Sequence, residues 1–439
     1  KGEAKMNIGL FTDTYFPQIN GVGTSVHMLY EELTALGHNV YIFTPSDPRR
    51  VSSDENIISM RSMPCFIIKS FRIGLLYSPH DLWKIKRLNL DIIHTQTEFS
   101  LGTFGKIISK ALNIPIVHTY HTMYEDYVHY IAKGIIITPS MSHSLSRFFC
   151  NRADAVVAPT QKVYDSLRSY GVCKNMFVIP TGINTDRFLS SNYSHESVSA
   201  LKKSYGFDNK TPVMLILGRI AMEKSIDFIF DAAGEIFDRI PEARILVVGD
   251  GPYKRTLENI AAEKGISDRT VFAGAKPWNE IGLYYQLGDV FVSASASETQ
   301  GLTFAEAMSA SIPVVARNDK CIEGLIEDGK TGFLFDTKEE FIEKTVYVLE
   351  NSDKLCELTQ AAYKSAQQFS SHTFGERIEA LYKTVIKYPE CFRPDSQINT
   401  STVILPKRIR VINGAKKRIK RIASKPANIV KRYIKIHER

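Results

Sequence analysis

Several features that would place a chain of 439 residues in a special class are scarce in this sequence or missing from it. No stretch approaches the roughly 18 to 20 apolar residues that a membrane-spanning helix requires. The six cysteines include no C-x-x-C pair, which argues against a zinc site and favours reduced thiols. With 26 glycines and 18 prolines, a collagen-like or low-complexity protein is also excluded. We therefore expect globular domains and a cytoplasmic protein.

An excess of one charge is missing from most of the chain as well. The net charge is +8, but residues 406–439 hold 13 Lys or Arg against one acid, which leaves the rest at −4. In this tail, apolar residues recur at spacings of three and four from Ile412 to Ile436, with cations between them. The pattern predicts one or two basic amphipathic helices, interrupted near Pro426, after a linker over 390–405.

Short apolar runs rich in β-formers alternate with helical periodicity along the rest of the sequence. The first series of expected strands is Ile8–Thr12, Asn39–Thr44, Ile92–Thr95, Ile116–Thr119, Ala155–Pro159 and Met176–Ile179. The second series is Val213–Leu217, Ala243–Gly249, Thr270–Ala273, Val290–Ser293, Ile312–Ala316 and Gly332–Phe335. Strands that alternate with helices, such as Ser25–Leu36 between the first two, indicate parallel sheets.

This alternation predicts an α/β protein with two Rossmann-like domains that face each other across a cleft. We expect an N-terminal domain over 6–188 and a C-terminal domain over 189–371. A helix over 372–388 should cross back to the first domain, and 389–439 should form the linker and the basic tail. Ligands of such sheets bind at the carboxyl ends of the strands, so the site should lie between the domains.

Two acids lie eight residues apart in the segment from Ser295 to Met308. Glu298 precedes an expected helix and Glu306 lies within it, while Gly301, Leu302 and Thr303 mark the start of the helix. Free amides at a helix N-terminus can hold a diphosphate, and carboxylates suit sugar hydroxyls. The alternative is a capping acid and a surface helical glutamate.

Two cations five residues apart follow the expected strand Val213–Leu217. Arg219 and Lys224 lie in one loop that leads to a helix, so both side chains could reach one diphosphate. A guanidinium fork and an ammonium would neutralise a leaving nucleoside diphosphate. A solvated surface pair is the alternative interpretation.

The segments Gly218-Arg219-x4-Lys224, Val248-Gly-Asp-Gly-Pro252 and Glu298-x7-Glu306 together resemble the signature set of the family 4 retaining glycosyltransferases, which have the GT-B fold. Four N-terminal segments resemble the diacylglycerol-directed subgroup of bacterial enzymes: 11–22, 93–98, 119–127 and 180–184. The resemblance covers about residues 6 to 388. It implies a UDP-sugar donor, no permanently bound cofactor and no obligatory metal.

Residues that match the family motifs inherit roles by this resemblance. Arg219 and Lys224 should contact the diphosphate, Glu298 the donor sugar and Glu306 the ribose. The amides near Gly301, Leu302 and Thr303 are expected at the diphosphate from their place at the helix start.

The N-terminal half contributes further residues to the expected site. Gly21 and Val22 should approach the phosphate, His121 the donor hexose, and Asp13 the acceptor hydroxyl. Asp13 could instead cap a turn, and a histidine at a strand end is often only structural. Glu125 and Asp126 are candidates for the acceptor side, which an exposed helix face would explain equally well.

The sequence departs from the common family pattern at two places. The glycines of Gly21-Val-Gly23 are placed differently, and Thr299-Gln300 stands where Pro-Phe is frequent. Neither departure removes a charged group. In Val248-Gly-Asp-Gly-Pro252, a single Asp provides no D-x-D pair, so we expect a backbone turn there and not a metal site.

The resemblance implies transfer of glucose from UDP-glucose to the 3-hydroxyl of 1,2-diacylglycerol. The alternatives are a second-step enzyme that extends the monoglucosyl lipid, a non-catalytic sugar-nucleotide or membrane-binding protein, and an oxidoreductase, although no G-x-G-x-x-G motif opens either sheet. The sequence does not decide between glucose and galactose, nor the oligomeric state.

A lipid acceptor requires that the enzyme reach the membrane, and we expect a peripheral protein on its cytoplasmic side. The cations expected at an anionic surface are Lys416, Lys417, Arg418, Lys420 and Arg421 in the tail, and Lys69 and Arg72 on a second face. Nucleic acid is the competing partner of the tail, but Tyr433 alone could stack on a base there, and the isoleucine spacing suits lipid.

Overall fold

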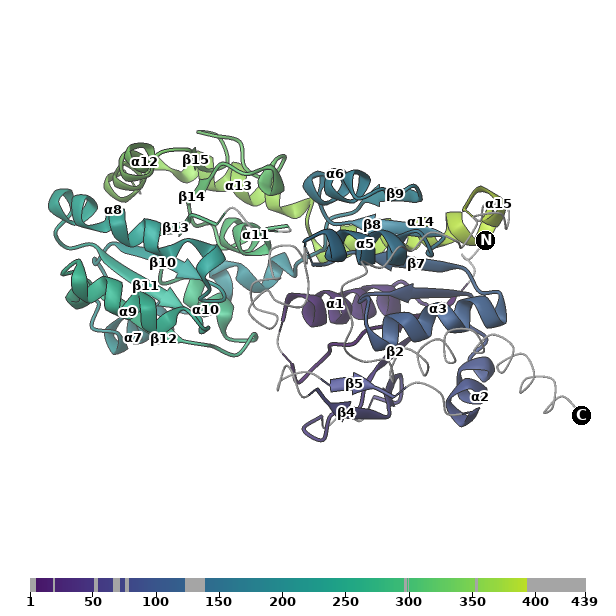
Figure 1. The fold of residues 1–439 in the computed structure, drawn as a ribbon. Coiled ribbons are helices and arrows are strands. Elements are labelled where there is room, and N and C mark those ends of the chain that lie inside the picture. The colour runs from purple at the N-terminus through teal and green to yellow at the C-terminus, as the bar shows by residue number, and fades with distance from the viewer. Residues whose placement is uncertain are drawn as a thin grey trace, which may run out of the picture.

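The structure is a computed structural model that describes residues 5–18, 20–50, 54–65, 72–75, 79–122, 139–295, 298, 300–351 and 354–392. Two parallel sheets, each with helices packed on it, lie side by side in the described chain (Figure 1). The expected architecture of two Rossmann-like domains is thereby confirmed.

The first sheet is parallel throughout and has the strand order β3-β2-β1-β6-β7-β8-β9. Its strands are β1 (Asn7–Phe11), β2 (Asn39–Pro45), β3 (Ile57–Met60), β6 (Ile92–Thr95), β7 (Ile116–Thr119), β8 (Ala155–Ala158) and β9 (Asn175–Val178). The helices of this half are α1 (Gly21–Ala35), α2 (Pro79–Arg87), α3 (Ser100–Leu112), α5 (Pro139–Cys150) and α6 (Gln161–Ser169). Strands β6, β7 and β8 are buried at every position, as expected for a parallel sheet covered on both faces.

The second sheet is also parallel and has the order β12-β11-β10-β13-β14-β15. Its strands are β10 (Val213–Leu217), β11 (Arg244–Val248), β12 (Thr270–Gly274), β13 (Val290–Ser293), β14 (Val314–Arg317) and β15 (Phe333–Phe335). The helices of this half are α7 (His195–Ser204), α8 (Ile226–Arg239), α9 (Lys254–Glu263), α10 (Ile281–Tyr285), α11 (Leu302–Ser309), α12 (Lys338–Glu350) and α13 (Cys356–Gln367).

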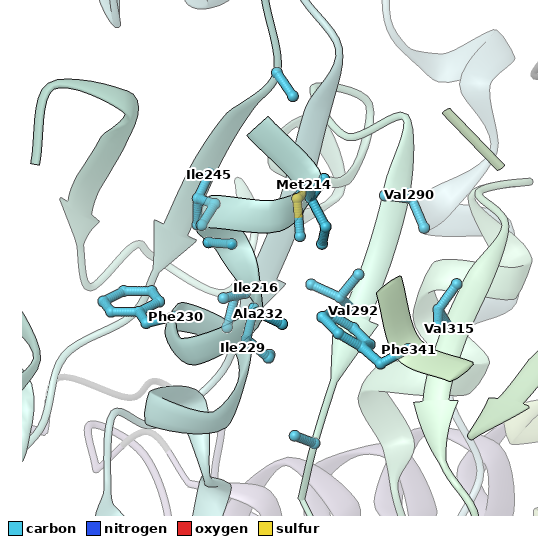
Figure 2. Close-up of a cluster of buried hydrophobic side chains, with 14 of the residues drawn as sticks. Met214, Ile216, Ile229, Phe230, Ala232, Ile245, Val290, Val292, Val315 and Phe341 are labelled. Atoms are coloured by element: carbon cyan, nitrogen blue, oxygen red, sulfur yellow. The ribbon is translucent and has the colours of Figure 1, made fainter. Parts of the chain in front are cut away.

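One core of the second domain lies between its sheet and the helices α8 and α12. Figure 2 shows side chains from the central strands, such as Met214 and Val292, facing Ile229 and Phe230 of α8 and Phe341 of α12. All of these side chains are buried. Burial of each such side chain contributes about 1.5–3 kcal/mol to folding, so the core holds the strand ends of the site in place.

The helix α14 (Ser371–Lys387) returns from the second domain and packs along α1 of the first (Figure 1). The Tyr382 hydroxyl lies 2.6 Å from Nδ1 of His94, and Glu379 pairs with His38 at 2.8 Å. A Cβ atom at Gly375 would crowd the side chain of Glu32, so this glycine permits the close approach of the two helices. The chain therefore crosses between the domains twice.

The packed chain extends beyond α14, which differs from the expected linker from residue 389 onward. The short helix α15 (Pro389–Phe392) follows, and Phe392 is buried in the core of the first domain. Asn175 donates a hydrogen bond to the Cys391 carbonyl at 3.1 Å. An apolar contact thus keeps this segment on the first domain.

Three short strands at the edge of the first domain were not expected from the sequence. β3 joins the sheet, while β4 (Ser62–Pro64) and β5 (Arg72–Gly74) form a separate antiparallel pair. Helix α1 also begins four residues before the expected start, because the Asn20 side chain accepts a hydrogen bond from the amide of Gly23 and caps it.

None of the helices in the described ranges is long and apolar enough to cross a membrane.

Candidate active site

Several predicted site residues, and Gln96, which was not predicted, follow the strands at which the order of each sheet reverses. Asp13 and Gln96 come after β1 and β6, which are neighbours in the first sheet. Arg219 and Glu298 come after β10 and β13, which are neighbours in the second. Ligands of open α/β sheets bind beyond the carboxyl ends of such strands, where the connections diverge. Both switch points therefore carry candidate residues.

The loop that carries Arg219 is supported by the glycine-rich turn after β11. A Cβ atom at Gly249 would overlap the carbonyl oxygen of Gly218, and one at Gly251 would overlap that of Ile220. The Ile220 amide donates to the Asp250 carbonyl at 2.9 Å. The Val248–Pro252 motif thus acts as a backbone turn that positions the Arg219 loop.

The cations of this loop are paired with carboxylates. Lys224 Nζ lies 2.5 Å from Oε1 of Glu298, and Arg219 forms an ion pair with Glu223. The 3₁₀ helix η5 (Met222–Lys224) orients Lys224 toward the Glu298 loop. Both pairs are partly exposed, so a diphosphate can approach the two cations from solvent. The structure therefore brings Lys224 and Glu298 into contact and places Arg219 in the same loop as Lys224; their roles toward a diphosphate stay predictions.

Helix α11 begins next to this cluster. Gly301 precedes the helix with φ of 69°, a left-handed conformation that glycine adopts without strain. The amides of Leu302 and Thr303 lie in the first turn, where the amides lack acceptors within the helix. The N-terminus of α11 follows Glu298 within four residues, so its positive end lies close to the Lys224–Glu298 pair.

Glu306, on the second turn of α11, is held from the neighbouring helix. The Tyr285 hydroxyl, at the end of α10, donates to Oε2 of Glu306 at 2.8 Å. Burial raises the pKa of Glu306 to about 7, although the Tyr285 hydroxyl and the nearby Arg187 oppose this shift. Glu306 is therefore a carboxyl group that ionises near neutral pH. Tyr285 and Arg187 are contributors that the motif did not predict.

The N-terminus of α1 also carries candidates for the donor. Gly21 is its first residue, and among the described residues no atom lies within 4 Å of the place a Cβ would take. The protein interior therefore gives no steric reason for glycine there. Val22 is half-buried and packs against the core of the first domain.

Asp13 is buried at the end of β1, and its carboxylate is used inside the protein. It accepts hydrogen bonds from Thr97 Oγ1 at 2.6 Å, from the Leu101 amide at 2.8 Å and from the Ser100 hydroxyl. These donors surround the start of α3, so Asp13 caps that helix from a distant part of the sequence. Burial raises the pKa of Asp13. Its role toward an acceptor stays a prediction.

His121 follows β7 and is bonded to the neighbouring strand end. Its Nε2 lies 2.8 Å from Oε1 of Gln96, a buried side chain that the motif did not single out. Burial lowers the pKa of His121 to about 4, so the ring is neutral at physiological pH. A neutral imidazole can donate through one nitrogen and accept through the other, which suits a contact with sugar hydroxyls.

The remaining predicted residues lie away from this cluster or outside the described residues. Arg72, on β5, donates to the Ser62 hydroxyl at 2.8 Å and lies on the small antiparallel pair. Outside the described residues are Lys69, Glu125, Asp126, Lys416, Lys417, Arg418, Lys420 and Arg421. Within the described ranges, no group of three or more His, Cys, Asp or Glu could hold a metal ion.

Comparisons with known families match both halves of the chain. The model described as Glycosyltransferase Family 4 matches residues 19–187, and the model described as Glycosyl transferases group 1 matches residues 197–365. The two matches correspond to the two sheets described above and together cover most of the chain.

Curated relatives match over most of their own length. An alpha-monoglucosyldiacylglycerol synthase from Streptococcus pneumoniae is 39% identical over 383 residues, which cover 87% of this chain and 86% of the relative. A synthase of the same name from Acholeplasma laidlawii is 35% identical over 389 residues, which cover 87% of this chain and 98% of the relative.

Among solved structures, the Anabaena protein HepE in complex with UDP and glucose is similar in fold. The TM-score is 0.68 at 18% identity, and the match covers 86% of this chain and 100% of that structure. At this identity the likeness supports the fold alone.

Proposed function

Because this chain belongs to glycosyltransferase family 4 and has the GT-B fold, we propose that it transfers glucose from UDP-glucose to the 3-hydroxyl of 1,2-diacylglycerol with retention of configuration. The product would be an α-monoglucosyl lipid. The two relatives named for this product, at 39% and 35% identity, support the choice of acceptor and sugar.

The observation that carries the proposal is the cluster of Arg219, Lys224 and Glu298 at the switch point of the second sheet. Two cations there can bind a diphosphate, and a carboxylate within 2.5 Å of Lys224 can accept hydrogen bonds from a hexose. The amides at the start of α11 add further donors. Glu306, one helical turn beyond, would accept the ribose hydroxyls when ionised.

The proposed reaction exchanges one bond at the anomeric carbon for another on the same face. The bond from C1 of glucose to the β-phosphate oxygen breaks, and a bond from C1 to the lipid hydroxyl oxygen forms. The departing phosphate oxygen takes the proton of that hydroxyl. Arg219, Lys224 and the α11 amides would stabilise the negative charge that develops on the diphosphate, which accelerates the step if these contacts strengthen in the transition state.

His121 and Gln96 would complete the site from the first domain. They follow β7 and β6, which are neighbours in the parallel sheet, and ligands of this fold bind beyond such carboxyl ends. The neutral His121 ring would contact the hexose without adding charge beside the leaving group. Domain closure would bring it against a donor held mainly by the second domain.

We further propose that the enzyme binds the cytoplasmic face of an anionic membrane, where its acceptor resides. Trp83 on α2 is 46% exposed, with the Arg87 guanidinium 4.5 Å from its ring centroid, and Lys84 and Lys86 lie on the same helix. The same domain also has exposed apolar side chains on and just after the β4–β5 pair, namely Met63, Ile73 and Leu75. Exposed apolar residues beside cations favour a lipid interface.

A product analysis tests the proposed reaction directly. Purified protein is offered UDP-glucose or UDP-galactose with diacylglycerol or monoglucosyl lipid in anionic vesicles. We expect glucose transfer to diacylglycerol, identified by mass and by the anomeric proton coupling of an α-linkage. Transfer to the monoglucosyl lipid alone would instead support the second-step alternative, and transfer to neither would reject the proposal.

A truncation tests the membrane proposal. Removal of residues 406–439 takes away a net charge of +12, and each cation near an anionic surface contributes on the order of 1 kcal/mol to binding. We expect the truncated protein to sediment less with anionic vesicles, while neutral vesicles serve as the control. Equal sedimentation of both proteins with anionic vesicles would contradict the role of the tail.

A further inference from the structure

The side-chain amide of Gln300 is bonded to both backbone groups of one distant residue. The Thr181 amide donates to Oε1 of Gln300 at 2.8 Å, and Nε2 of Gln300 donates to the Thr181 carbonyl at 2.7 Å. The two residues are 119 positions apart in sequence, and Gln300 and Thr181 are 8% and 4% exposed. We call this pair of hydrogen bonds the Gln300 clasp.

The two hydrogen bonds of the clasp allow only one orientation of the Gln300 side-chain amide. A backbone N–H can only donate and a carbonyl can only accept, so the two bonds fix which end of the amide faces which group. In a buried place, each bond replaces a contact with water that the chain has given up. Alanine at this position would leave the amide and the carbonyl of Thr181 without these partners, which is the costly outcome for buried polar groups.

The clasp connects the donor loop to the segment that joins the two sheets. On one side, Gln300 lies two residues after Glu298 and directly before Gly301, where the chain turns into α11. On the other side, Thr181 lies between β9 and the 3₁₀ helix η3 (Thr185–Phe188). The loop that presents Glu298 to Lys224 is therefore held by the connection between the domains.

We propose that Gln300 is a positioning residue, which sets the place of Glu298 against Lys224 and so the place of the donor hexose. The inference rests on the proposed function, because it assigns Glu298 to the sugar. Family members with a Pro-Phe pair at this position have no side-chain amide there, so the clasp distinguishes this chain from them. Helix α11 itself is anchored separately, by the buried Phe304 and Met308 and by the Tyr285 bond to Glu306.

A matched control exists in the same domain. Gln286 also donates a hydrogen bond to the segment that joins the sheets, from Nε2 to the Phe188 carbonyl at 2.9 Å. It follows α10 and does not belong to the donor loop. A variant at Gln286 therefore removes a comparable bond to the same segment and leaves the Glu298 loop alone.

The first measurement needs no substrate. Hydrogen–deuterium exchange of the ligand-free protein is followed in the peptide that contains the Thr181 amide. Gln300→Ala should speed exchange of one amide there, and Gln286→Ala should not. Unchanged exchange in Gln300→Ala would overturn the clasp, whatever the enzyme does.

The second measurement separates the sugar from the nucleotide. If the clasp positions Glu298, then Gln300→Ala should weaken binding of UDP-glucose about tenfold, which corresponds to about 1.4 kcal/mol, but weaken binding of UDP less than about threefold. Gln286→Ala should change neither. Equal weakening of both ligands in Gln300→Ala would overturn the positioning role. A wild-type protein that binds no UDP-glucose would refute the proposed function, and this is seen before any variant is compared.

A third variant tests the hydrogen-bond pattern. In Gln300→Glu, the ionised carboxylate can accept from the Thr181 amide but repels the Thr181 carbonyl, whereas the protonated form can again accept and donate. The rate of Gln300→Glu relative to wild type should therefore rise as the pH falls from 8 to 6. The relative rate of Gln300→Ala should stay flat, and a flat ratio in both variants would overturn the pattern.

Discussion

The charged and polar side chains in the loops after β10 and β13 differ in exposure and in their partners from those in the loops after β1, β6 and β7. In the second domain, Arg219, Lys224 and Glu298 are partly exposed and paired with opposite charges that a ligand can displace. In the first domain, Asp13, Gln96 and His121 are bonded within the protein, and burial raises the pKa of Asp13 and lowers that of His121. The second domain thus offers charged groups that a charged donor can reach, whereas the polar groups of the first domain are already bonded inside the protein.

The largest expected effect comes from removing a charge in the second domain, and it is on the transfer rate. Lys224→Ala removes a cation from the leaving diphosphate, so the transfer rate should fall about 10²–10³-fold, the range for loss of one group that stabilises developing charge. Thermal unfolding should change little, because the Lys224–Glu298 pair is partly exposed.

Lys338→Ala is a suitable control for this variant. Lys338 pairs with Glu235 at 2.6 Å on the surface of the same domain, at the start of α12, which follows the edge strand β15 and not the switch-point strands β10 and β13. Its loss should leave the rate unchanged. A rate for Lys224→Ala within threefold of wild type would contradict the assignment of Lys224 to the diphosphate.

In the first domain, the expected effect is on stability. Asp13→Ala leaves the Thr97 and Ser100 hydroxyls and the Leu101 amide without their acceptor, so the free energy of unfolding should fall by about 2–4 kcal/mol. Chemical denaturation measures this change.

Asp13→Asn distinguishes a helix cap from a group that acts on the acceptor hydroxyl. The amide oxygen can still accept from the Leu101 amide, so most of the stability should return, and activity should return with it. If Asp13→Asn is stable but inactive, then Asp13 acts on the acceptor, as the sequence comparison implies.

An intermediate effect is expected from Glu306, whose pKa of about 7 places its ionisation within the working range. UDP-glucose affinity should rise about tenfold from pH 6 to pH 8, because only the ionised carboxyl accepts from both ribose hydroxyls and about one-tenth of it is ionised at pH 6. The ligand itself does not titrate in this range. Glu306→Gln should abolish the pH dependence in calorimetric titrations, and a dependence that persists would contradict the assignment.

The raised pKa of Glu306 also predicts how stability depends on pH: the contribution of this group to stability should fall as the pH rises, whereas the affinity should increase. A folded pKa raised above the unfolded value means that the folded state binds more protons between the two values. The contribution of Glu306 to stability is therefore complete below about pH 4.5 and is lost as the pH rises through about 7. In the ligand-free protein, the melting temperature of Glu306→Gln relative to wild type should increase from pH 5 to pH 8.

The smallest expected effect concerns His121. Its pKa of about 4 predicts that the ring stays neutral from pH 5 to pH 8, so its ring ¹⁵N and ¹³C shifts should not change over that range. His121→Gln, which keeps a neutral donor and acceptor, should lose only a few-fold in rate, less than His121→Ala. Titration of the ring near pH 6.5 would contradict the prediction that His121 is neutral in this range.

The sequence predicted the central strands well and the edge of the first sheet poorly. β6, β7, β10 and β13 each begin with apolar residues and are buried at all positions or at all but the last, and their bounds agree with the expected ones. β3, β4 and β5 are three or four residues long and partly exposed, and β5 contains Arg72 and Gly74. Edge strands of this kind depend on pairing with a neighbour that no local pattern indicates.

In the site, the sequence predicted the residues that carry charge but not those that hold them. Arg219, Lys224 and Glu298 were predicted from spacing and family motifs. Tyr285 and the clasp partner Thr181 depend on contacts across 21 and 119 residues, which the periodicity of a segment does not contain. For Gln300 there was a signal, because Thr-Gln replaces the frequent Pro-Phe, but its meaning required the fold.

Because α14 returns to the first domain, a membrane anchor that follows it would restrain that domain and not the second. Phe392, at the end of the described chain, is packed in the core of that domain, and the exposed Trp83 of α2 belongs to it as well. An attachment made by residues after 392 would therefore restrain the first domain. The second domain would stay free to move relative to the bilayer. UDP could then leave and a new donor could bind while the enzyme remains attached to the membrane that holds its lipid.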